Sequence, residues 1–180
     1  SGYIQKHPTS AVAYVQKARA MRYEGSAPLE ERVALIERAI NIDPESPEAL
    51  TAMADHLSYR AGEDDGLKSF REAQRLAEKA VQIAPHWPYP HFALWSLCLS
   101  QGLLEEADSH LRALITKGGI PAQLLDFAHN MLVGARPGAI VFTNGDNDTF
   151  PPEALRAMYG FREDVNIINL SLMNYVSYST

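Results

Sequence analysis

Side chains that carry oxygen are concentrated in the sequence Asn-Gly-Asp-Asn-Asp-Thr at residues 144–149. Asp146 and Asp148 are separated by one asparagine, and Asn144 precedes them, so several amide and carboxylate groups can meet at one turn. Gly145 gives that turn access to positive φ angles. Hard cations such as Mg²⁺ and Ca²⁺ prefer oxygen ligands of this kind. The segment is therefore a candidate metal or polar-ligand site formed by Asn144, Asp146 and Asp148.

The same residues also have a structural interpretation. Asn and Asp in turns bond their own backbone, and a carboxylate at the start of a helix is favoured by the helix dipole. Asp148 or Thr149 would then cap a helix that begins at Pro151 and Pro152. A structural cap, a ligand or metal site, and catalysis by the aspartates stay open as three interpretations, with the cap preferred.

A strand–helix–strand pattern surrounds this segment. Residues 139–143 and 165–172 are short apolar runs, and residues 151–160 predict a helix with prolines at its start and glycine at its end. Such a βαβ unit has parallel strands with a right-handed crossover, and its ligands gather at the carboxyl ends of the strands. Both polar stretches, residues 144–149 and 171–174, fall at those ends.

The faces of this predicted sheet need cover, because parallel strands are normally buried on both sides. Only one helix is available within the unit, so the second face is expected to pack on the helix that precedes the unit or on a second chain. A homodimer through this unit is one way to cover it. Ile140, Phe142, Ile167 and Leu170 are therefore expected to be buried, and Asp146 is expected to be at least partly accessible.

The N-terminal part of the chain contains an internal repeat. The stretches ERVALIERAINIDP, EAQRLAEKAVQIAP and EEADSHLRALITKGG align, and each reads as the second helix of a helical hairpin. Ala73 and Ala107 lie 34 residues apart, which is the tetratricopeptide period. Ala80 and Leu111 are expected at contacts between helices. One hairpin cannot bury its own apolar face, so three are expected to stack, followed by a capping helix at residues 121–135.

Residues 9–119 resemble the tetratricopeptide-repeat family. Ile-Asp-Pro at 42–44 and Ile-Ala-Pro at 83–85 match the place where that family closes its second helix, and Gly102 matches its turn glycine, whereas glycines replace the third proline motif. The resemblance implies a concave face, lined by the first helix of each pair, that binds a peptide partner. The residues implied at this face are Tyr14, Lys17, Met21, Met53, His56, Tyr89 and Phe92. The alternative for each of them is a position in the core.

A second resemblance covers residues 137–174. Gly-Asp-Asn-Asp-Thr-Phe at 145–150, Arg-x-Asp-Val at 162–165 and Asn-Leu-Ser-Leu at 169–172 are similar to a segment of a poorly characterised family of bacterial membrane proteins related to protein O-mannosyltransferases. The helix departs from the more aromatic sequence of that family. Sugar transfer in that family belongs to a membrane part, so the resemblance implies no catalytic residue in this segment.

Composition argues against several classes of function. The net charge of −6 and the lack of a Lys/Arg cluster argue against nucleic-acid binding. No apolar run reaches the length of a membrane helix and no signal-peptide core is present, so the sequence predicts a soluble chain, either cytoplasmic or periplasmic. Cys98 lies in an apolar run and is expected to be buried and unreactive. His86 and His91 are expected at the surface or as caps, with a zinc pair as the alternative.

The sequence therefore predicts a mainly α protein in two parts. A tetratricopeptide-like solenoid of about three repeats with its capping helix spans residues 3–135, and a βαβ unit spans residues 136–180. The first hypothesis for function is a protein-interaction scaffold or adaptor. The second is a fragment or companion of a larger, glycosyltransferase-related enzyme, with an acidic ligand site at Asp146 and Asp148. Mg²⁺ or Ca²⁺ at that site is the one cofactor that the sequence suggests.

Overall fold

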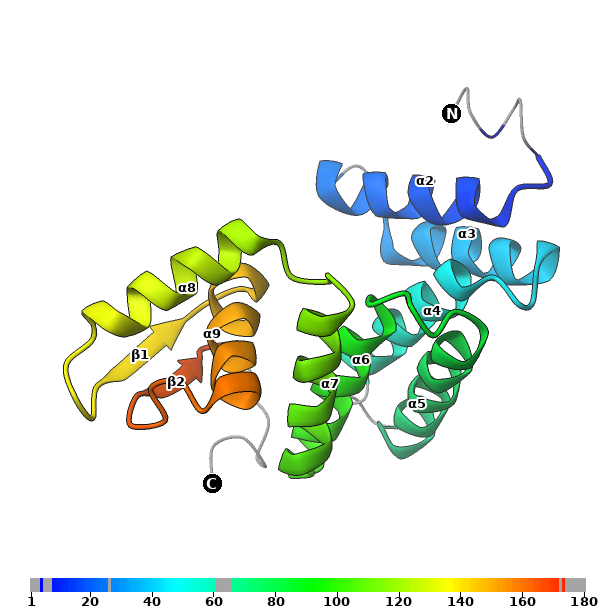
Figure 1. The fold of residues 1–180 in the computed structure, drawn as a ribbon. Coiled ribbons are helices and arrows are strands. Elements are labelled where there is room, and N and C mark those ends of the chain that lie inside the picture. Colours follow the sequence, from blue (N-terminus) through cyan, green and yellow to red (C-terminus); the bar gives the residue numbers. More distant parts are fainter. Residues whose placement is uncertain (1–3, 5–7, 26, 61–65, 172, 174–180) are drawn as a thin grey trace. The chain divides into compact units, whose positions relative to one another are not determined.

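The structure is a computed structural model that describes residues 4, 8–25, 27–60, 66–171 and 173 (Figure 1). The chain is mainly helical, with a two-stranded parallel sheet in its C-terminal part, as predicted. It divides into two compact units, Ser1–His86 and Trp87–Thr180. The boundary expected between residues 135 and 136 falls inside the second unit.

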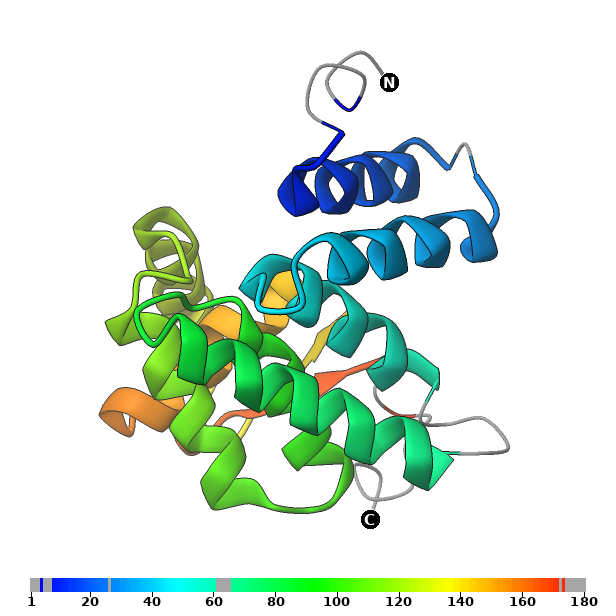
Figure 2. The same cartoon turned by 90° about the vertical axis from the view of Figure 1, so that its right-hand side faces the viewer.

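Two helical hairpins form the first unit. Helix α2 (Ala11–Glu24) pairs with α3 (Leu29–Ile42), and α4 (Pro47–Arg60) pairs with α5 (Gly66–Ile83). Figure 2 shows α2 and α3 side by side. Helix α4 also contacts both α2 and α3, so the first helices of the two hairpins are neighbours. The predicted repeat of paired helices is confirmed in this unit.

Local capping fixes where these helices begin and end. Ser10 Oγ accepts the N–H of Ala13 at 3.4 Å, and Gly25 closes α2 in the left-handed region with a φ of 61°. Between the hairpins, Ser46 Oγ accepts the N–H of Ala49 at 3.3 Å, and Pro47 is the first residue of α4. The chain therefore turns sharply between helices at positions that its sequence marks.

Small side chains fill most of the contacts between the helices of the first unit. One core cluster consists of Ala11, Val15, Ala18, Ile36, Ala39, Ala49 and Ala52. Ala73, Ala77 and Ala80 of α5 are fully buried, as expected for Ala80. Because such interfaces are close-packed, they leave no room for a larger or charged side chain.

The second unit joins a third hairpin to the βαβ unit. The hairpin consists of α6 (Pro90–Ser100) and α7 (Leu104–Thr116), and α8 (Ala122–Gly134) is the predicted capping helix. Strand β1 (Ile140–Thr143), α9 (Asp146–Tyr159) and β2 (Asn166–Asn169) follow, with β1 and β2 parallel. Leu111 is buried in the core between these helices, as predicted, and so is Cys98.

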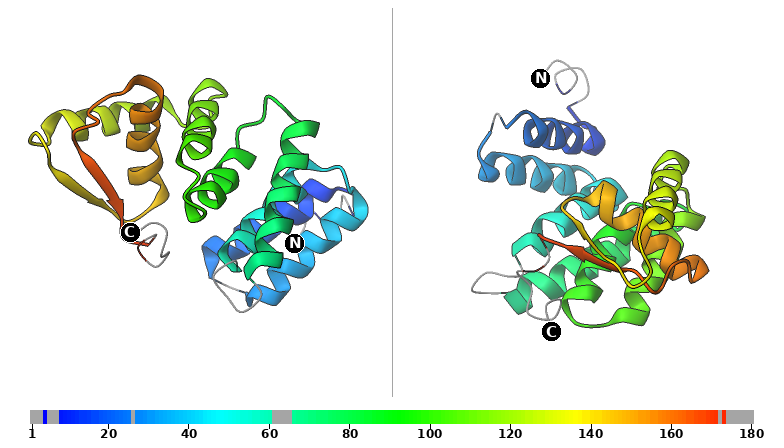
Figure 3. Two further views of the ribbon diagram at one scale, coloured as in Figure 1. Left: turned by 90° about the horizontal axis from the view of Figure 1, so that it is seen from below. Right: turned by 90° about the vertical axis from the view of Figure 1, so that its left-hand side faces the viewer.

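Helices cover one face of the sheet in the described part of the second unit. Val141 and Ile167, which are paired across the strands, pack in a cluster with Ala128, Leu132 and Leu155 of α8 and α9. The right panel of Figure 3 shows the strands in front of α9. Helix α8 therefore joins α9 on this face.

Among the described residues, the opposite face of the sheet is open, which corrects one expectation from the sequence. Side chains alternate between the faces of a strand, so Ile140 and Phe142 point away from the helices and are 57% and 61% exposed. Leu170 is 47% exposed, whereas Ile167 is 6% exposed. The predicted burial is right for Ile167 and wrong for the other three, because α8 packs on the face that α9 already covers.

Candidate functional site

The acidic segment is the start of a helix, where the sequence predicted a loop. Asp146–Thr149 forms the first turn of α9, and both prolines lie inside the helix. The Asp148 carboxylate reaches back from this turn and accepts the N–H groups of Asn144 at 3.0 Å and of the N-cap residue Gly145 at 2.8 Å. This cap by the carboxylate of the third helical residue places a negative charge at the positive end of the helix dipole. The cap stabilises a helix that begins at Asp146, ahead of Pro151 and Pro152, which have no backbone N–H group.

A buried polar network connects this cap to the ends of both strands. Thr149 Oγ1 donates to the Gly145 carbonyl at 2.7 Å, lies 2.8 Å from Thr143 Oγ1, and accepts from Asn169 Nδ2 at 2.6 Å. Thr143, Thr149 and Asn169 are at most 5% exposed. Because Thr143 ends β1 and Asn169 ends β2, the network holds the two carboxyl ends and the start of α9 together.

The geometry favours the structural interpretation of Asp148. Both of its carboxylate oxygens already accept backbone N–H groups, so a cation at Asp148 would compete with the cap for the same carboxylate. Asn144 and Asp146 are exposed, as expected for Asp146. Among the described residues, no three His, Cys, Asp or Glu side chains lie where they could hold a metal ion together.

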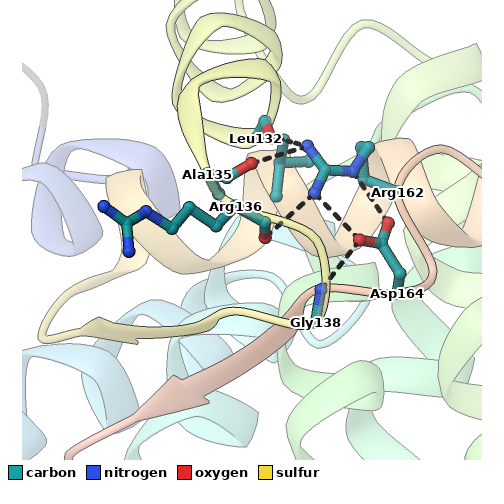
Figure 4. Close-up of polar contacts among 6 residues, drawn as sticks. All are labelled: Leu132, Ala135, Arg136, Gly138, Arg162 and Asp164. Atoms are coloured by element: carbon teal, nitrogen blue, oxygen red, sulfur yellow. Dashed lines mark hydrogen bonds and ion pairs between the residues drawn. The ribbon is translucent and has the colours of Figure 1, made fainter.

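The second unit has another polar cluster, built on the Arg-x-Asp-Val sequence (Figure 4). The Arg162 guanidinium donates to both carboxylate oxygens of Asp164 at 2.7 Å and 2.9 Å. The same guanidinium donates to three carbonyl groups at and after the end of α8, those of Leu132, Ala135 and Arg136. Asp164 in turn accepts the N–H of Gly138 at 3.1 Å. The pair therefore joins the connection before β1 to the connection before β2.

Electrostatics agree with this structural role. The Arg162 guanidinium, together with the N–H of Gly138, holds the pKa of Asp164 well below its usual range. Arg162 also adopts a φ of 53°, in the left-handed region that non-glycine residues seldom occupy. Its hydrogen bonds offset the cost of that backbone conformation.

Replacement of Arg162 by Lys tests whether the cluster needs the planar guanidinium group and its several N–H donors. A lysine keeps the charge but cannot bond two carboxylate oxygens and three carbonyl groups at once. We expect Arg162→Lys to lower the Tm by several degrees in a thermal melt followed by circular dichroism. Arg136→Lys is the matched control, because only the backbone carbonyl of Arg136 takes part in the cluster. Equal melting of Arg162→Lys and the parent would contradict this role.

The predicted groove residues of the first unit lie on its two neighbouring first helices. Tyr14, Lys17 and Met21 recur at helical spacing along α2, and Met53 and His56 lie on α4. All five are partly exposed. Tyr14 and Met53 also pack against the core cluster, and the Tyr14 hydroxyl donates to the Pro8 carbonyl at 3.3 Å.

The two remaining groove residues belong to the second unit. Tyr89 is 49% exposed just before α6. Phe92 is partly buried and packs edge-on against Phe150 of α9, with ring centroids 4.7 Å apart. Trp95 contacts the same Phe150 ring at 4.6 Å. The phenylalanine that follows the acidic segment therefore anchors α9 to α6, and Phe92 contributes to that packing.

A pair of histidines is a feature that the sequence did not suggest. His91 on α6 is 6% exposed, and its Nδ1 lies 3.0 Å from Nδ1 of His110 on α7. The other ring nitrogen of His91, Nε2, is buried without a hydrogen-bond partner among the described residues. Burial lowers the pKa of His91 to about 4, and His110 and Lys117 contribute to this shift by charge repulsion. The zinc alternative paired His91 with His86 and overlooked His110, which no spacing rule connects to His91.

This pair gives the second unit a dependence on pH. The pKa of His91 falls from 6.5 to about 4 on folding, so the unfolded chain binds the extra proton between these values. We expect this residue to remove about 3 kcal/mol of stability as the pH falls from 6.5 to 4. Glu153 acts in the opposite direction, because burial raises its pKa from 4.5 to about 7 and folding then takes up a proton.

Urea unfolding of the parent and of His91→Gln, at several pH values, separates the two residues. Glu153 contributes about equally to both proteins, so the difference between them reports on His91 together with its contact to His110. The parent should lose stability relative to the variant as the pH falls through the stated range. Parallel pH profiles for the two proteins would contradict the assignment.

Comparison with known proteins adds one match. The model of the family described as TMEM260-associated domain 2 matches residues 124–178. This range begins inside α8 and includes β1, α9 and β2. It agrees with the packing, in which α8 belongs with the βαβ unit. No curated protein and no solved structure gives a significant match to the chain.

Proposed function

We propose that this chain is a protein-interaction module of the tetratricopeptide type, acting as a scaffold or adaptor. The observation that carries the proposal is that the groove residues expected on α2 and α4 are all partly exposed. They are Tyr14, Lys17, Met21, Met53 and His56, and we propose that they form one face. We call these five residues the α2/α4 face. Aromatic and Met side chains at such a surface adapt to the apolar anchors of a peptide.

The partner proposed for this face is a peptide with apolar anchor residues. Four of the five side chains on the α2/α4 face are apolar, aromatic or imidazole groups, and Lys17 is the one residue of the five with a formal charge. Paired helices with buried alanines give the face a rigid base, which lowers the entropy cost of binding. No helix of the described residues is both long and apolar enough to cross a membrane.

A displayed library of random peptides tests the proposal without the need to choose a candidate peptide. Peptides enriched on the parent should bind Lys17→Glu/Met21→Ser at least about tenfold more weakly, because the changes remove two contacts and reverse one charge. The matched control is Arg38→Glu/Gln82→Ser, which changes exposed residues on α3 and α5. Equal affinity for both double variants, or failure to enrich any peptide, would contradict the proposal.

A second candidate is that the βαβ unit is part of, or a companion to, a larger glycosyltransferase-related enzyme. The match to TMEM260-associated domain 2 favours it, since TMEM260 is related to O-mannosyltransferases. The open sheet face supports the same idea, because parallel sheets in larger domains are covered on both sides. In this candidate, Asp146 at the carboxyl edge of the sheet contributes to a ligand or metal site.

Calorimetric titration with Mg²⁺ or Ca²⁺ distinguishes the two candidates. With Asp148 committed to its cap, we expect no saturable binding either by the parent or by Asp146→Asn. Saturable binding to the parent that is lost in Asp146→Asn would contradict this expectation and favour the second candidate. Asp126→Asn, at an exposed position on α8, is the control for a general effect of charge.

The open sheet face also allows a direct test of a homodimer. Ile140 and Phe142 on this face are each more than half exposed, and no charged side chain lies on β1 or β2. A dimer through the face would dissociate in Phe142→Asp, as measured by sedimentation equilibrium. A parent that stays monomeric at high concentration would exclude this mode of covering the sheet.

A further inference from the structure

The segment between β1 and α9 contains the one Asn-Gly pair of the sequence, Asn144 followed by Gly145. Both residues are exposed. Glycine has no side chain to shield its backbone nitrogen, so this nitrogen can approach the side-chain amide carbon of the preceding asparagine. The pair therefore has the composition and the exposure needed for attack by the Gly145 nitrogen on the side-chain amide of Asn144.

We propose that Asn144 is a site of spontaneous conversion to aspartate and isoaspartate, and that Asp148 controls its rate. In the first step the deprotonated backbone nitrogen of Gly145 forms a bond to Cγ of Asn144. The bond from Cγ to the side-chain nitrogen breaks, and ammonia leaves with a proton from solvent. Water then opens the resulting cyclic imide at either carbonyl group. One opening gives aspartate, and the other gives isoaspartate, whose backbone runs through the side-chain carbon.

The Asp148 cap opposes the first step in two ways. It accepts the N–H of Gly145 at 2.8 Å, so the nucleophilic nitrogen is held in a charge-assisted hydrogen bond. Its negative charge also disfavours removal of the proton from that nitrogen, because a second negative charge would form beside it.

The two backbone polar groups of Asn144 are also hydrogen-bonded. Its N–H donates to Asp148 Oδ2 at 3.0 Å, and its carbonyl accepts from Ser171 Oγ at 3.4 Å. The peptide groups before and after Asn144 are thus both fixed, and attack requires the cap to open. The rate of conversion then reports how often the start of α9 opens.

Conversion would alter the same structure that restrains it. Isoaspartate inserts one carbon into the backbone immediately before Gly145, which shifts its N–H relative to Asp148. Either product also adds a negative charge beside Asp146 and Asp148. The modified chain would therefore lose part of the cap that joins β1 to α9.

Peptide mapping by mass spectrometry measures the conversion in the full chain during incubation at mildly alkaline pH. Asp148→Ala should convert at Asn144 about fivefold faster than the parent, since a helix cap contributes about 1 kcal/mol to the closed state. Asp146→Ala is the matched control and should convert at the rate of the parent, because the cap on Gly145 comes from Asp148. Gly145→Ala should slow conversion, because its Cβ hinders the approach of the backbone nitrogen, and this added Cβ meets only an ordinary contact with Asp148 at 3.6 Å.

A second comparison does not depend on the folding of any variant. The parent in denaturing urea has no cap and should convert at least about fivefold faster than the folded parent. Equal rates in the folded and denatured parent would overturn the proposal. Conversion in Asp148→Ala that is equal to or slower than in the parent would also overturn it, the slower rate because the carboxylate would then act as a base.

Discussion

Ala80→Glu should destabilise the first unit by about 4 kcal/mol or more. Ala80 lies on α5 with no exposed surface, in a contact between helices that alanines fill. A glutamate there needs space that a close-packed interface lacks, and it buries a charge without a partner. Because whole domains are stable by only about 5–15 kcal/mol, this change should remove much of the folded population. Urea unfolding followed by circular dichroism measures the loss.

Gln82→Glu provides the control for this experiment. Gln82 lies two residues further along α5 and is exposed, so the same charge costs at most about 0.5 kcal/mol there. An unfolding curve of Ala80→Glu that matches the parent would contradict the packing of α5 and the repeat that predicts it.

Thr149→Val should destabilise the second unit by about 3 kcal/mol. Valine has the shape of threonine, so the change removes the hydroxyl and leaves the volume nearly unaltered. The Gly145 carbonyl loses its 2.7 Å donor, and Asn169 Nδ2 loses an acceptor at 2.6 Å. Asn169 lies at the junction of β1, β2 and α9 and is 5% exposed, so water cannot easily replace its lost bond.

Thr116→Val is the matched control for the network. The Thr116 hydroxyl bonds to the Arg112 carbonyl at 3.0 Å, but Thr116 is exposed, so water can replace this bond. Its loss should cost well under 1 kcal/mol in the same unfolding assay. Equal effects of the two threonine substitutions would show that the buried network does not hold the strand ends together.

The helical part of the fold could be predicted because its signals are local and repeated. The three aligned stretches correspond to α3, α5 and α7, and apolar spacing with Pro121 predicted α8. Ala80 and Leu111 are buried as expected, since both lie on the apolar side of that pattern, where Ala77 is the equivalent of Leu111 and Leu114 is the equivalent of Ala80. Strands β1 and β2 also follow from short apolar runs with helical sequence between them.

The start of α9 could not be predicted because proline is usually found in the first turn of a helix, and in α9 both prolines come after the first turn. Two consecutive prolines normally mark the first turn of a helix, so the sequence placed the helix start at Pro151. The Asp148 carboxylate instead satisfies the N–H groups of Asn144 and Gly145, which lets the helix begin one turn earlier. The hydrogen bonds of the Asp148 side chain, which only the structure shows, place the cap before the prolines.

Contacts between distant residues were the other source of error. The hydrogen bond between His91 and His110 depends on how α6 and α7 pack, and no local pattern encodes that packing. The error about the open face of the sheet has the same origin. The alternation of side chains along β1 shows that the sheet has two faces, but it does not show which face the helices cover. Helix α8 could have covered either face, and it packs beside α9.

Hydrogen–deuterium exchange of the full chain, with and without the tightest peptide from the displayed library, tests the proposed function most directly. If the α2/α4 face binds the peptide, amide exchange should slow along α2 and α4, and this protection should disappear in Lys17→Glu/Met21→Ser. Exchange in α3 and α5 should change much less. Protection confined to α3 and α5 or to the second unit, or protection that survives in the double variant, would contradict the account.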